Sequence, residues 1–306
     1  MSGCMEADRP TVDVLILTYG DYSGLSRTIE SILAQDYPLN TVVLSDDGSQ
    51  KLFPLRLIQQ LQTNSIPLII RNGKKNVGTV THMNIIARLV NGDYLKFMAA
   101  GDTFSDHSAL KELVDFAKQT DMPVVTSDCM VCSSNLKRQY YRFPGVHRGK
   151  WLGASGSELF SILAQGNIIS AVGTLFRKDF FQELGGFDES YRLLEDWPTW
   201  LRLSREGYSI PYLSRVTGLY AIGGISSIDN DAFNAPLLKN DMLHCYEKEI
   251  LPYIEVFVPA INRKIYYFYN KLKGMPLKVL VKEYFLLFIK DMVKRGIKRC
   301  MIGIHS

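Results

Sequence analysis

The first part of the chain alternates between short apolar runs and segments in which apolar residues return every three or four positions. The apolar runs predict strands at Val12–Leu17, Thr41–Leu44, Pro67–Ile70, Tyr94–Ala99 and Val124–Thr126. The segments between them have helical spacing, as in the series Leu25, Ile29, Ile32 and Leu33. Strands that alternate with helices form right-handed βαβ units. We therefore expect an α/β fold with a mainly parallel sheet and helices on both of its faces.

The pattern changes after Thr126. Residues Ser127–Trp151 are polar and aromatic with little periodicity, which predicts an irregular insertion or an acceptor-facing excursion. Further along, we expect a strand at Ala171–Phe176 and helices at Glu158–Gln165, Asp179–Leu184 and Glu195–Arg205. Beyond Gly223–Gly224 the chain becomes helical and basic. These changes predict one domain at residues 10–224, with halves at 10–126 and 127–224, and a helical extension at residues 225–306.

Composition and charge restrict the class of protein. Of the 306 residues, 46% are hydrophobic and 22% are charged, which is ordinary for a globular protein and excludes a disordered chain. The net charge of +4 is uneven, because residues 271–306 contain nine lysines and arginines and two acids, a net +7 that leaves −3 for the rest. In this tail, Val279–Ile297 mixes aliphatic residues with lysines, as does an amphipathic helix on an anionic membrane. The alternative is that this helix packs its apolar face on the rest of the chain.

The sequence also indicates a cytoplasmic location. The segment MSGCMEADRP at the start contains acids and lacks the apolar core of a secretory signal. No run reaches the roughly 18 apolar residues of a spanning helix. The five cysteines are an odd number spread through the chain, which favours reduced thiols. Cys129 and Cys132 have no second ligand pair at suitable spacing, so we do not expect a zinc site.

Charged residues follow the predicted strands, in the loops Thr18–Asp21, Ser45–Ser49, Arg71–Gly78 and Ala100–Asp106. In open α/β sheets, ligands bind outside the carboxyl ends of the strands. Asp46 and Asp47 are adjacent carboxylates, which repel each other unless a partner compensates them. This placement favours a binding site, although Asp-Gly-Ser is also a common turn with a capping Asp.

Three segments resemble one known family. They are VDVLILTYGDYSGLSRTIESILAQDYPLNTVVLSDDGS at Val12–Ser49, NVGTVTHMNIIARLVNGDYLKFMAAGD at Asn76–Asp102 and GGFDESYRLLEDWPTWLRL at Gly185–Leu203. In this order and spacing they are similar to glycosyltransferase family 2, whose members share the nucleotide-sugar-binding GT-A fold. The resemblance implies an inverting glycosyltransferase that moves a sugar from a nucleotide-sugar donor, expected to be a UDP-sugar, to a glycan or lipid-linked acceptor. It implies a role in bacterial surface polysaccharide synthesis, peripheral contact with the inner membrane face, and no nucleic-acid partner.

By this resemblance, the donor site consists of residues in the four loops. Those after the first two strands would contact the base and ribose, and those in the third loop would lie beside the diphosphate. Arg71 and Lys74 add positive charge there, and Asn84 stands at a later family asparagine. Each loop residue taken singly also fits an ordinary turn or a solvated lysine. The residues implied for the donor site are Thr18, Tyr19, Asp46, Asp47, Lys75, Asn76, Gly78, Gly101 and Asp102.

The fourth loop departs from the family pattern. Most members carry an Asp-x-Asp that binds the divalent cation on the diphosphate, whereas the aligned stretch Ala99-Ala100-Gly101-Asp102 keeps only Asp102. Mg²⁺ or Mn²⁺ often takes one or two protein carboxylates together with phosphates and water. Asp102 could hold the cation alone, Asp106 could assist it, or the basic third loop could replace the cation; loss of catalysis is a fourth possibility. We favour a cation at Asp102.

Glu195-Asp196-Trp197 resembles the family's Glu-Asp motif at the start of an acceptor-side helix. An inverting transfer needs a carboxylate that takes the proton of the attacking hydroxyl, and the motif position implies that Asp196 is this base. Glu195 would orient Asp196 or contact the acceptor. The alternative for both acids is a helix cap. Trp197 and Trp200 could offer a stacking face for a sugar, but their helical spacing favours core packing for at least one of them.

Two other functions are compatible with parts of the pattern. The missing Asp-x-Asp also fits a non-catalytic nucleotide-sugar-binding or assembly subunit. A similar sheet occurs in nucleotide-dependent dehydrogenases, but TYGDYSG stands after the first strand where these enzymes carry GxGxxG. The sequence therefore favours the glycosyltransferase.

Overall fold

The computed structural model of the chain describes residues 9–145, 153–154, 156–223 and 235–302. Part of the polar segment expected at Ser127–Trp151 lies outside these ranges. So do Gly224, at the expected domain boundary, and the first residues of the expected extension.

Four parallel strands form the first half of the sheet, in the order β3-β2-β1-β4. Thr18 lies opposite Asp46, and Leu17 lies opposite Ala99, so the carboxyl ends of β1, β2 and β4 share one edge. The predicted alternation of strand and helix is confirmed. The strands are β1 (Val12–Thr18), β2 (Leu39–Asp46), β3 (Leu68–Asn72) and β4 (Tyr94–Ala99), and the helices are α1 (Leu25–Leu33), α2 (Leu55–Gln62) and α3 (Thr79–Ala87).

The second half of the sheet is mixed. β8 (Leu175–Arg177) lies antiparallel between β4 and β6 (Val124–Cys132). β9 (Tyr212–Ala221) runs parallel to β6, and the short β5 (Thr103–Phe104) pairs with β9. β7 (Gln139–Phe143) forms an antiparallel pair with β6. In the part of the chain that the structure describes, the sheet has nine strands.

The prediction for residues after Thr126 was wrong in one respect. β6 continues to Cys132, and β7 lies in the segment that was expected to be irregular. Ser127 and Asp128 concealed the strand, because polar residues interrupt the apolar pattern although both are fully buried here. Asp128 tolerates burial because it forms an ion pair with Arg142 of β7.

The other elements of this half lie close to their predicted positions. The helices are α4 (Ala109–Thr120), α6 (Gly156–Leu163), α7 (Lys178–Glu183) and α8 (Asp196–Arg205). The strand expected at Ala171–Phe176 is shorter, because it is preceded by a 3₁₀ turn, η2 (Ala171–Gly173). The buried ammonium of Lys96 donates to the carbonyls of Val172 and Thr174, which draws these carbonyls away from a regular ladder.

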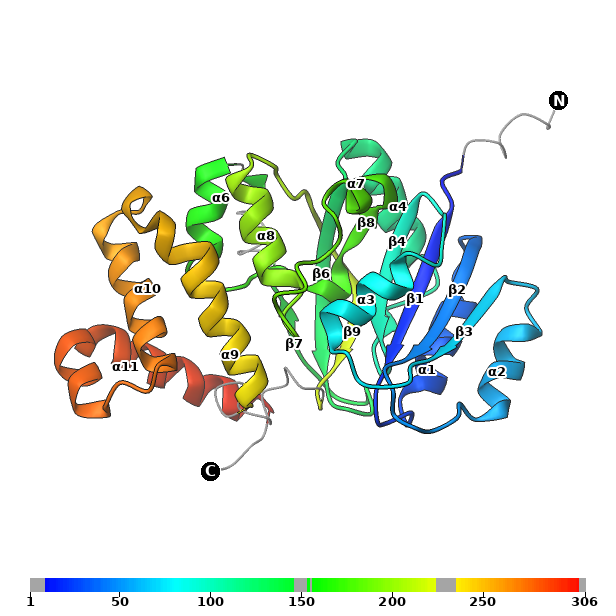
Figure 1. Cartoon of the computed structure of the whole chain (residues 1–306), viewed down its shortest axis with the longest axis horizontal. Coiled ribbons are helices and arrows are strands. Elements are labelled where there is room, and N and C mark those ends of the chain that lie inside the picture. Colours follow the sequence, from blue (N-terminus) through cyan, green and yellow to red (C-terminus); the bar gives the residue numbers. More distant parts are fainter. Residues whose placement is uncertain (1–8, 146–152, 155, 224–234, 303–306) are drawn as a thin grey trace.

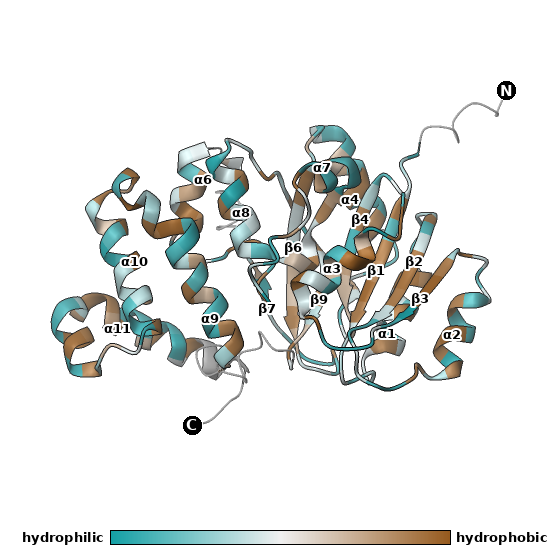
Figure 2. Cartoon of the chain, viewed as in Figure 1, coloured by the Kyte–Doolittle hydropathy of each residue, from teal (hydrophilic) through white to brown (hydrophobic). Residues whose placement is uncertain are grey.

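Two hydrophobic cores cover the two faces of the sheet. Successive strand residues point to opposite faces, so Leu15 and Val43 join the core beneath α3, α6 and α8, whereas Val14 and Val42 join the core beneath α1, α2 and α4. Figure 1 shows helices on both sides of the sheet, and Figure 2 shows that its central strands are strongly hydrophobic. The expected doubly covered sheet is confirmed.

The C-terminal helices extend the first of these cores. They comprise α9 (Pro236–Cys245), the π-helical η3 (Tyr246–Ile250), the 3₁₀-helical η4 (Leu251–Val256), α10 (Pro259–Leu272) and α11 (Leu277–Ile302). Tyr246 packs edge-on against Trp197 of α8, with 5.4 Å between the ring centroids. α11 lies against α10 and is interrupted at Tyr284, which has φ −131° and ψ 32°. No helix within the described ranges is both long enough and apolar enough to cross a membrane.

Candidate donor and acceptor site

The loops after β1 and β2 are joined to each other. Thr18 Oγ1 donates to Asp46 Oδ2 at 3.1 Å, and Ser49 donates to Asp46 through both its backbone N–H and its hydroxyl. Gly20 N in turn donates to Ser49 Oγ at 2.6 Å. The ring of Tyr19 remains 56% exposed beside this network. The two loops therefore form one rigid edge with an accessible aromatic ring, which suits stacking on a base.

The pKa values of the two adjacent carboxylates in the second loop are shifted in opposite directions. Burial acts to raise the pKa of Asp46, but the hydrogen bonds from Ser49, Tyr22 and Thr18 outweigh it, so this pKa lies below its ordinary value. Burial raises the pKa of Asp47, and the N–H groups of the third loop offset this only in part. Asp46 is therefore the more firmly ionised member of the pair.

Asp47 connects the second loop to the third. Its carboxylate accepts the backbone N–H groups of Val77, at 3.1 Å, and Gly78, at 2.9 Å. The two loops touch so closely that a Cβ on Gly48 would lie 2.3 Å from the carbonyl carbon of Lys75, and Gly48 has φ +83°. Asp47 thus holds the Asn76–Gly78 segment in place, with Lys75 exposed at its rim.

The fourth loop carries a single buried acid. Asp102 is 4% exposed and accepts the N–H of Ala221 at 3.0 Å. Burial raises its pKa to about 7, against the opposing effects of this hydrogen bond and of Lys96. Gly101 has φ +112°, and its Cα lies only 2.5 Å from where a Cβ on Gly24 would stand. This close approach of two glycines fixes Asp102 against the start of α1.

Asp106 does not lie free beside Asp102. Both of its oxygens accept from Arg215 at 2.9 Å, and Ser105 and Ser108 also donate to it. Among the described residues, no three His, Cys, Asp or Glu side chains form a group that could hold a metal ion. The fourth loop therefore supplies one carboxylate, from Asp102.

Glu195 and Asp196 form a pair of acids at the start of α8. Asp196 is the first residue of the helix, where exposed N–H groups favour a negative charge. Its carboxylate accepts Asn167 Nδ2 at 2.7 Å and Trp197 N at 2.6 Å. Burial raises the pKa of Glu195, followed by the charge of Asp196, and burial also raises the pKa of Asp196 despite its hydrogen bonds. Both residues remain partly accessible, so a ligand can reach the pair.

The segment before the acids is held by Asp241 of α9. Asp241 Oδ2 accepts the N–H groups of Arg192, Leu193 and Leu194 at 2.9, 2.6 and 3.1 Å. Asp241 is 7% exposed, so this contact is shielded from water. Sequence reasoning missed Asp241, because no local pattern relates an acid in a C-terminal helix to a loop far upstream.

Arg192 also connects the acids to the donor loops. Its guanidinium donates to Asn76 Oδ1 at 2.6 Å, and its carbonyl accepts Val80 N at 3.3 Å. Asn84 supports the same region, because its Oδ1 accepts Phe187 N at 2.9 Å. The structure thus links the third loop to the segment just before the acidic pair, through an arginine that the sequence analysis did not single out.

Core packing, expected for at least one of Trp197 and Trp200, is found for both, and neither forms a sugar-stacking face. Trp197 is 3% exposed and donates its indole N–H to Leu163 O, and Trp200 is 1% exposed and stacks on Phe176. Both indoles therefore belong to the core that anchors α8. At the other end of α8, Arg205 pairs with Glu249 at 2.7 Å.

A doubly covered sheet whose first three strand-end loops interlock, with an acidic pair linked to the third loop through Arg192, has the arrangement of the GT-A fold. A sequence model of the family described as "Glycosyl transferase family 2" matches residues 13–185, more than half of the chain. The chain belongs to this family and is a glycosyltransferase. Glu195 and Asp196 lie beyond the matched residues.

Relatives and solved structures agree with this assignment. The chain is 23% identical over 243 residues to the processive diacylglycerol beta-glycosyltransferase of Mycoplasma genitalium, covering 78% of this chain and 70% of that protein. It is 21% identical to the uncharacterized glycosyltransferase YwdF of Bacillus subtilis, over 69% of this chain and 74% of the other.

Two solved structures share the fold. S. aureus TarS 1–349 in complex with UDP-GlcNAc has a TM-score of 0.59 at 15% identity, covering 85% of this chain and 74% of that chain. The mannosyltransferase PcManGT from Pyrobaculum calidifontis in complex with GDP-Man and Mn²⁺ has a TM-score of 0.58 at 15% identity, covering 97% and 84%. These likenesses show the GT-A fold.

The contact of Asp241 with three N–H groups gives a prediction about stability. Asp241→Ala leaves these donors buried without an acceptor, so we expect the free energy of unfolding to fall by about 3 kcal/mol. Urea denaturation followed by circular dichroism measures this change. The control is Glu255→Ala, an exposed acid of η4. Equal losses in the two variants would show that Asp241 is not what holds residues 192–194.

The raised pKa of Glu195 gives a prediction about pH. The folded protein binds this proton more tightly than the unfolded chain, because burial raises the pKa of Glu195 from 4.5 to about 8. The free energy of unfolding therefore falls as the pH rises from 4.5 to about 8. Glu195→Gln removes the effect and should gain on the order of 2 kcal/mol relative to the natural chain between pH 5 and pH 9.

Urea denaturation at several pH values measures this gain. Glu206→Gln, which changes an exposed acid at the other end of α8, should follow the natural chain at every pH. Parallel pH profiles for Glu195→Gln and the natural chain would contradict the raised pKa of Glu195.

Proposed function

We propose that the protein is an inverting glycosyltransferase that moves a sugar from a UDP-sugar to a hydroxyl of a glycan or lipid-linked saccharide, in bacterial surface polysaccharide synthesis. The observation that carries this proposal is the acidic pair at the start of α8, linked to the third donor loop through Arg192 and Asn76. In this proposal, residues 10–126 bind the donor, residues 127–224 bind the acceptor, and the helices of residues 225–306 form an extension.

The choice of donor and acceptor rests on chemistry at both ends of the site. The accessible ring of Tyr19, beside Thr18 and the ionised Asp46, suits a base and ribose, and Lys75 with Lys74 suits a diphosphate. The complex of TarS with UDP-GlcNAc supports a UDP-sugar. The name of the M. genitalium relative supports an acceptor attached to lipid. Such an acceptor implies a cytoplasmic enzyme in peripheral contact with an anionic inner membrane face.

Asp196 acts as the base in this proposal. The acceptor hydroxyl attacks the anomeric carbon from the face opposite the diphosphate, its proton passes to Asp196, and the bond from the anomeric carbon to the diphosphate oxygen breaks. The pKa values of both acids are raised, and two adjacent acids with raised pKa values hold one proton between them over part of the pH range. Hydrogen bonds from Asn167 and Trp197 favour the ionised form of Asp196, so the shared proton resides on Glu195.

The fourth loop could bind a divalent cation only if the diphosphate of the donor supplied further oxygen ligands. Asp102 offers a hard carboxylate, whereas Asp106 is occupied by Arg215. One protein carboxylate with phosphate oxygens and water is a usual environment for Mg²⁺, and PcManGT was solved with Mn²⁺. We infer that Asp102 holds the cation, which when bound neutralises charge on the leaving diphosphate. Arg71, Lys74 and Lys75 add positive charge from the third loop.

The assignment of the base is tested by Asp196→Asn. We expect transfer to fall by about 10²- to 10⁴-fold while donor affinity changes little, because the amide cannot take the proton. Release of nucleoside diphosphate from a panel of UDP- and GDP-sugars measures turnover, and calorimetry measures donor binding. Asp115→Asn, an exposed acid of α4, is the control. Unchanged turnover in Asp196→Asn would mean that another group takes the proton.

The assignment of the cation is tested by Asp102→Asn. Mn²⁺ should strengthen UDP binding to the natural chain by about tenfold, or about 1.4 kcal/mol, and should have little effect on Asp102→Asn. The amide keeps an oxygen that can accept Ala221 N, so the loop is preserved. Asp106→Asn should keep the full gain from Mn²⁺. An equal gain in all three proteins would show that Asp102 is not a ligand.

A further inference from the structure

The last helix exposes apolar residues along one side. After the interruption at Tyr284, six large apolar side chains of α11 are between 42% and 72% exposed, and they are Phe285, Leu286, Ile289, Met292, Val293 and Ile297. Residues three and four positions apart share one face of a helix, so these six side chains form a continuous stripe. We call this stripe the apolar face of α11.

The opposite side of α11 is the side that packs on the protein. Asp291 accepts a hydrogen bond from Tyr267 Oη of α10 at 3.1 Å, and it forms an ion pair with Lys271, which also belongs to α10. Closer to the interruption, Asn270 donates to Tyr284 Oη at 3.1 Å. A surface helix of a globular protein ordinarily turns its apolar side inward. Here the inward side holds these polar contacts together with the half-buried Leu287 and Phe288, and a second apolar side is left outward.

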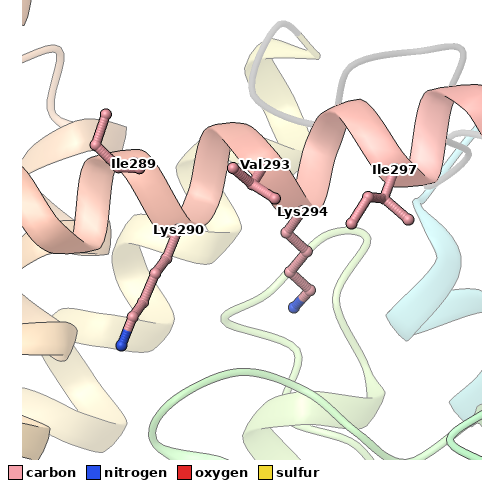
Figure 3. Close-up of a pocket in the computed structure, with 5 residues that line it drawn as sticks. All are labelled: Ile289, Lys290, Val293, Lys294 and Ile297. Carbon is pink, nitrogen blue, oxygen red and sulfur yellow. The ribbon is translucent and has the colours of Figure 1, made fainter.

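Lysines border the apolar face. Ile289, Val293 and Ile297 line a shallow hollow along α11 together with Lys290 and Lys294 (Figure 3). Figure 3 shows the two lysine side chains extending from the same side of the helix. Both lysines are exposed, and the surrounding tail carries a net +7. The acid Asp291 is turned toward α10, so the outward side of this stretch is apolar and basic.

We propose that the apolar face of α11 docks on an anionic lipid bilayer, with the helix lying in the plane of the interface. Apolar side chains flanked by lysines match acyl chains flanked by anionic headgroups. A second copy of this chain would fit less well, because pairing two such faces brings two strongly basic tails together. The proposal rests on the proposed function only in that this bilayer carries the acceptor.

The position of α11 in the molecule agrees with docking on a bilayer. In the view of Figure 1, β1 runs toward the lower edge of the molecule, so its carboxyl end and α11 both lie toward that edge. A membrane at this edge would lie on the side of the molecule to which the strand-end site belongs.

Vesicle flotation of the full-length protein tests the proposal. We expect the protein to float with vesicles that contain phosphatidylglycerol, to float weakly with pure phosphatidylcholine, and to lose binding in high salt. The double variant Ile289→Ser/Val293→Ser should weaken partition by at least about tenfold. The double variant Lys290→Gln/Lys294→Gln should weaken it by about 30-fold on anionic vesicles only.

Matched controls remove equivalent groups elsewhere. Leu55→Ser changes a leucine of α2 that is 75% exposed, and Lys111→Gln/Lys118→Gln removes two exposed lysines of α4. Both controls should float like the natural chain, and so should Asp196→Asn, because flotation does not depend on transfer. Failure of catalysis with intact flotation would therefore affect the proposed function and not this inference.

Three outcomes would overturn the inference. The first is a natural chain that does not float with anionic vesicles. The second is flotation that neither double variant of α11 weakens, which would assign membrane contact to another surface. The third is self-association in sedimentation experiments that Ile289→Ser/Val293→Ser abolishes, without flotation, which would identify a second copy as the occupant.

Discussion

Buried carboxylates that accept backbone N–H groups hold the site of this protein together. Asp47 takes two such groups from the third loop, Asp241 takes three from the segment before the acidic pair, and Asp102 takes one from the end of β9. A carboxylate withdrawn from water is costly unless donors surround it, and a loop N–H is equally costly without an acceptor. Each contact therefore removes both the cost of a buried carboxylate and the cost of a buried N–H without an acceptor, and it fixes a loop.

This arrangement divides the acids into two groups. Those that hold loops direct charge into the protein, as Asp47 and Asp241 do, and Asp102 uses its Oδ1 in the same way. Those that remain partly accessible, Glu195 and Asp196, have raised pKa values and lie where a ligand can reach them. The same residue type thus provides both the framework and the reactive groups, and the environment decides which role each acid takes.

Sequence reasoning recovered the parts of the fold that depend on local pattern. The first four strands and the helices between them follow from apolar periodicity, and the strand-end position of Asp46 and Asp102 follows from that alternation. The apolar pattern failed to predict strands where buried polar residues form ion pairs with each other across the sheet. Asp128 and its partner Arg142 look like loop residues until the pairing of β6 with β7 is known. The insertion of β8 between β4 and β6 is likewise a matter of long-range pairing that periodicity cannot indicate.

The candidate site was recoverable to the extent that it consists of motifs. The strand-end loops and the acidic pair could be named from the sequence, but Arg192, Asn167 and Asp241 could not, because each acts through a partner far along the chain. Trp197 and Trp200 show the converse, since a pattern that suited a sugar proved to be core packing. Distant partners are found only when the fold brings them together.

The contact between Asp241 of α9 and residues 192–194 also limits which segments of this chain can be replaced by those of a relative. The family model ends at residue 185, yet residues 192–194 depend on an acid of α9. A chimera joined between these two points would combine a loop and a helix that had not been selected to fit. In a chimera with a relative, the acidic pair and the C-terminal helices should therefore come from the same protein.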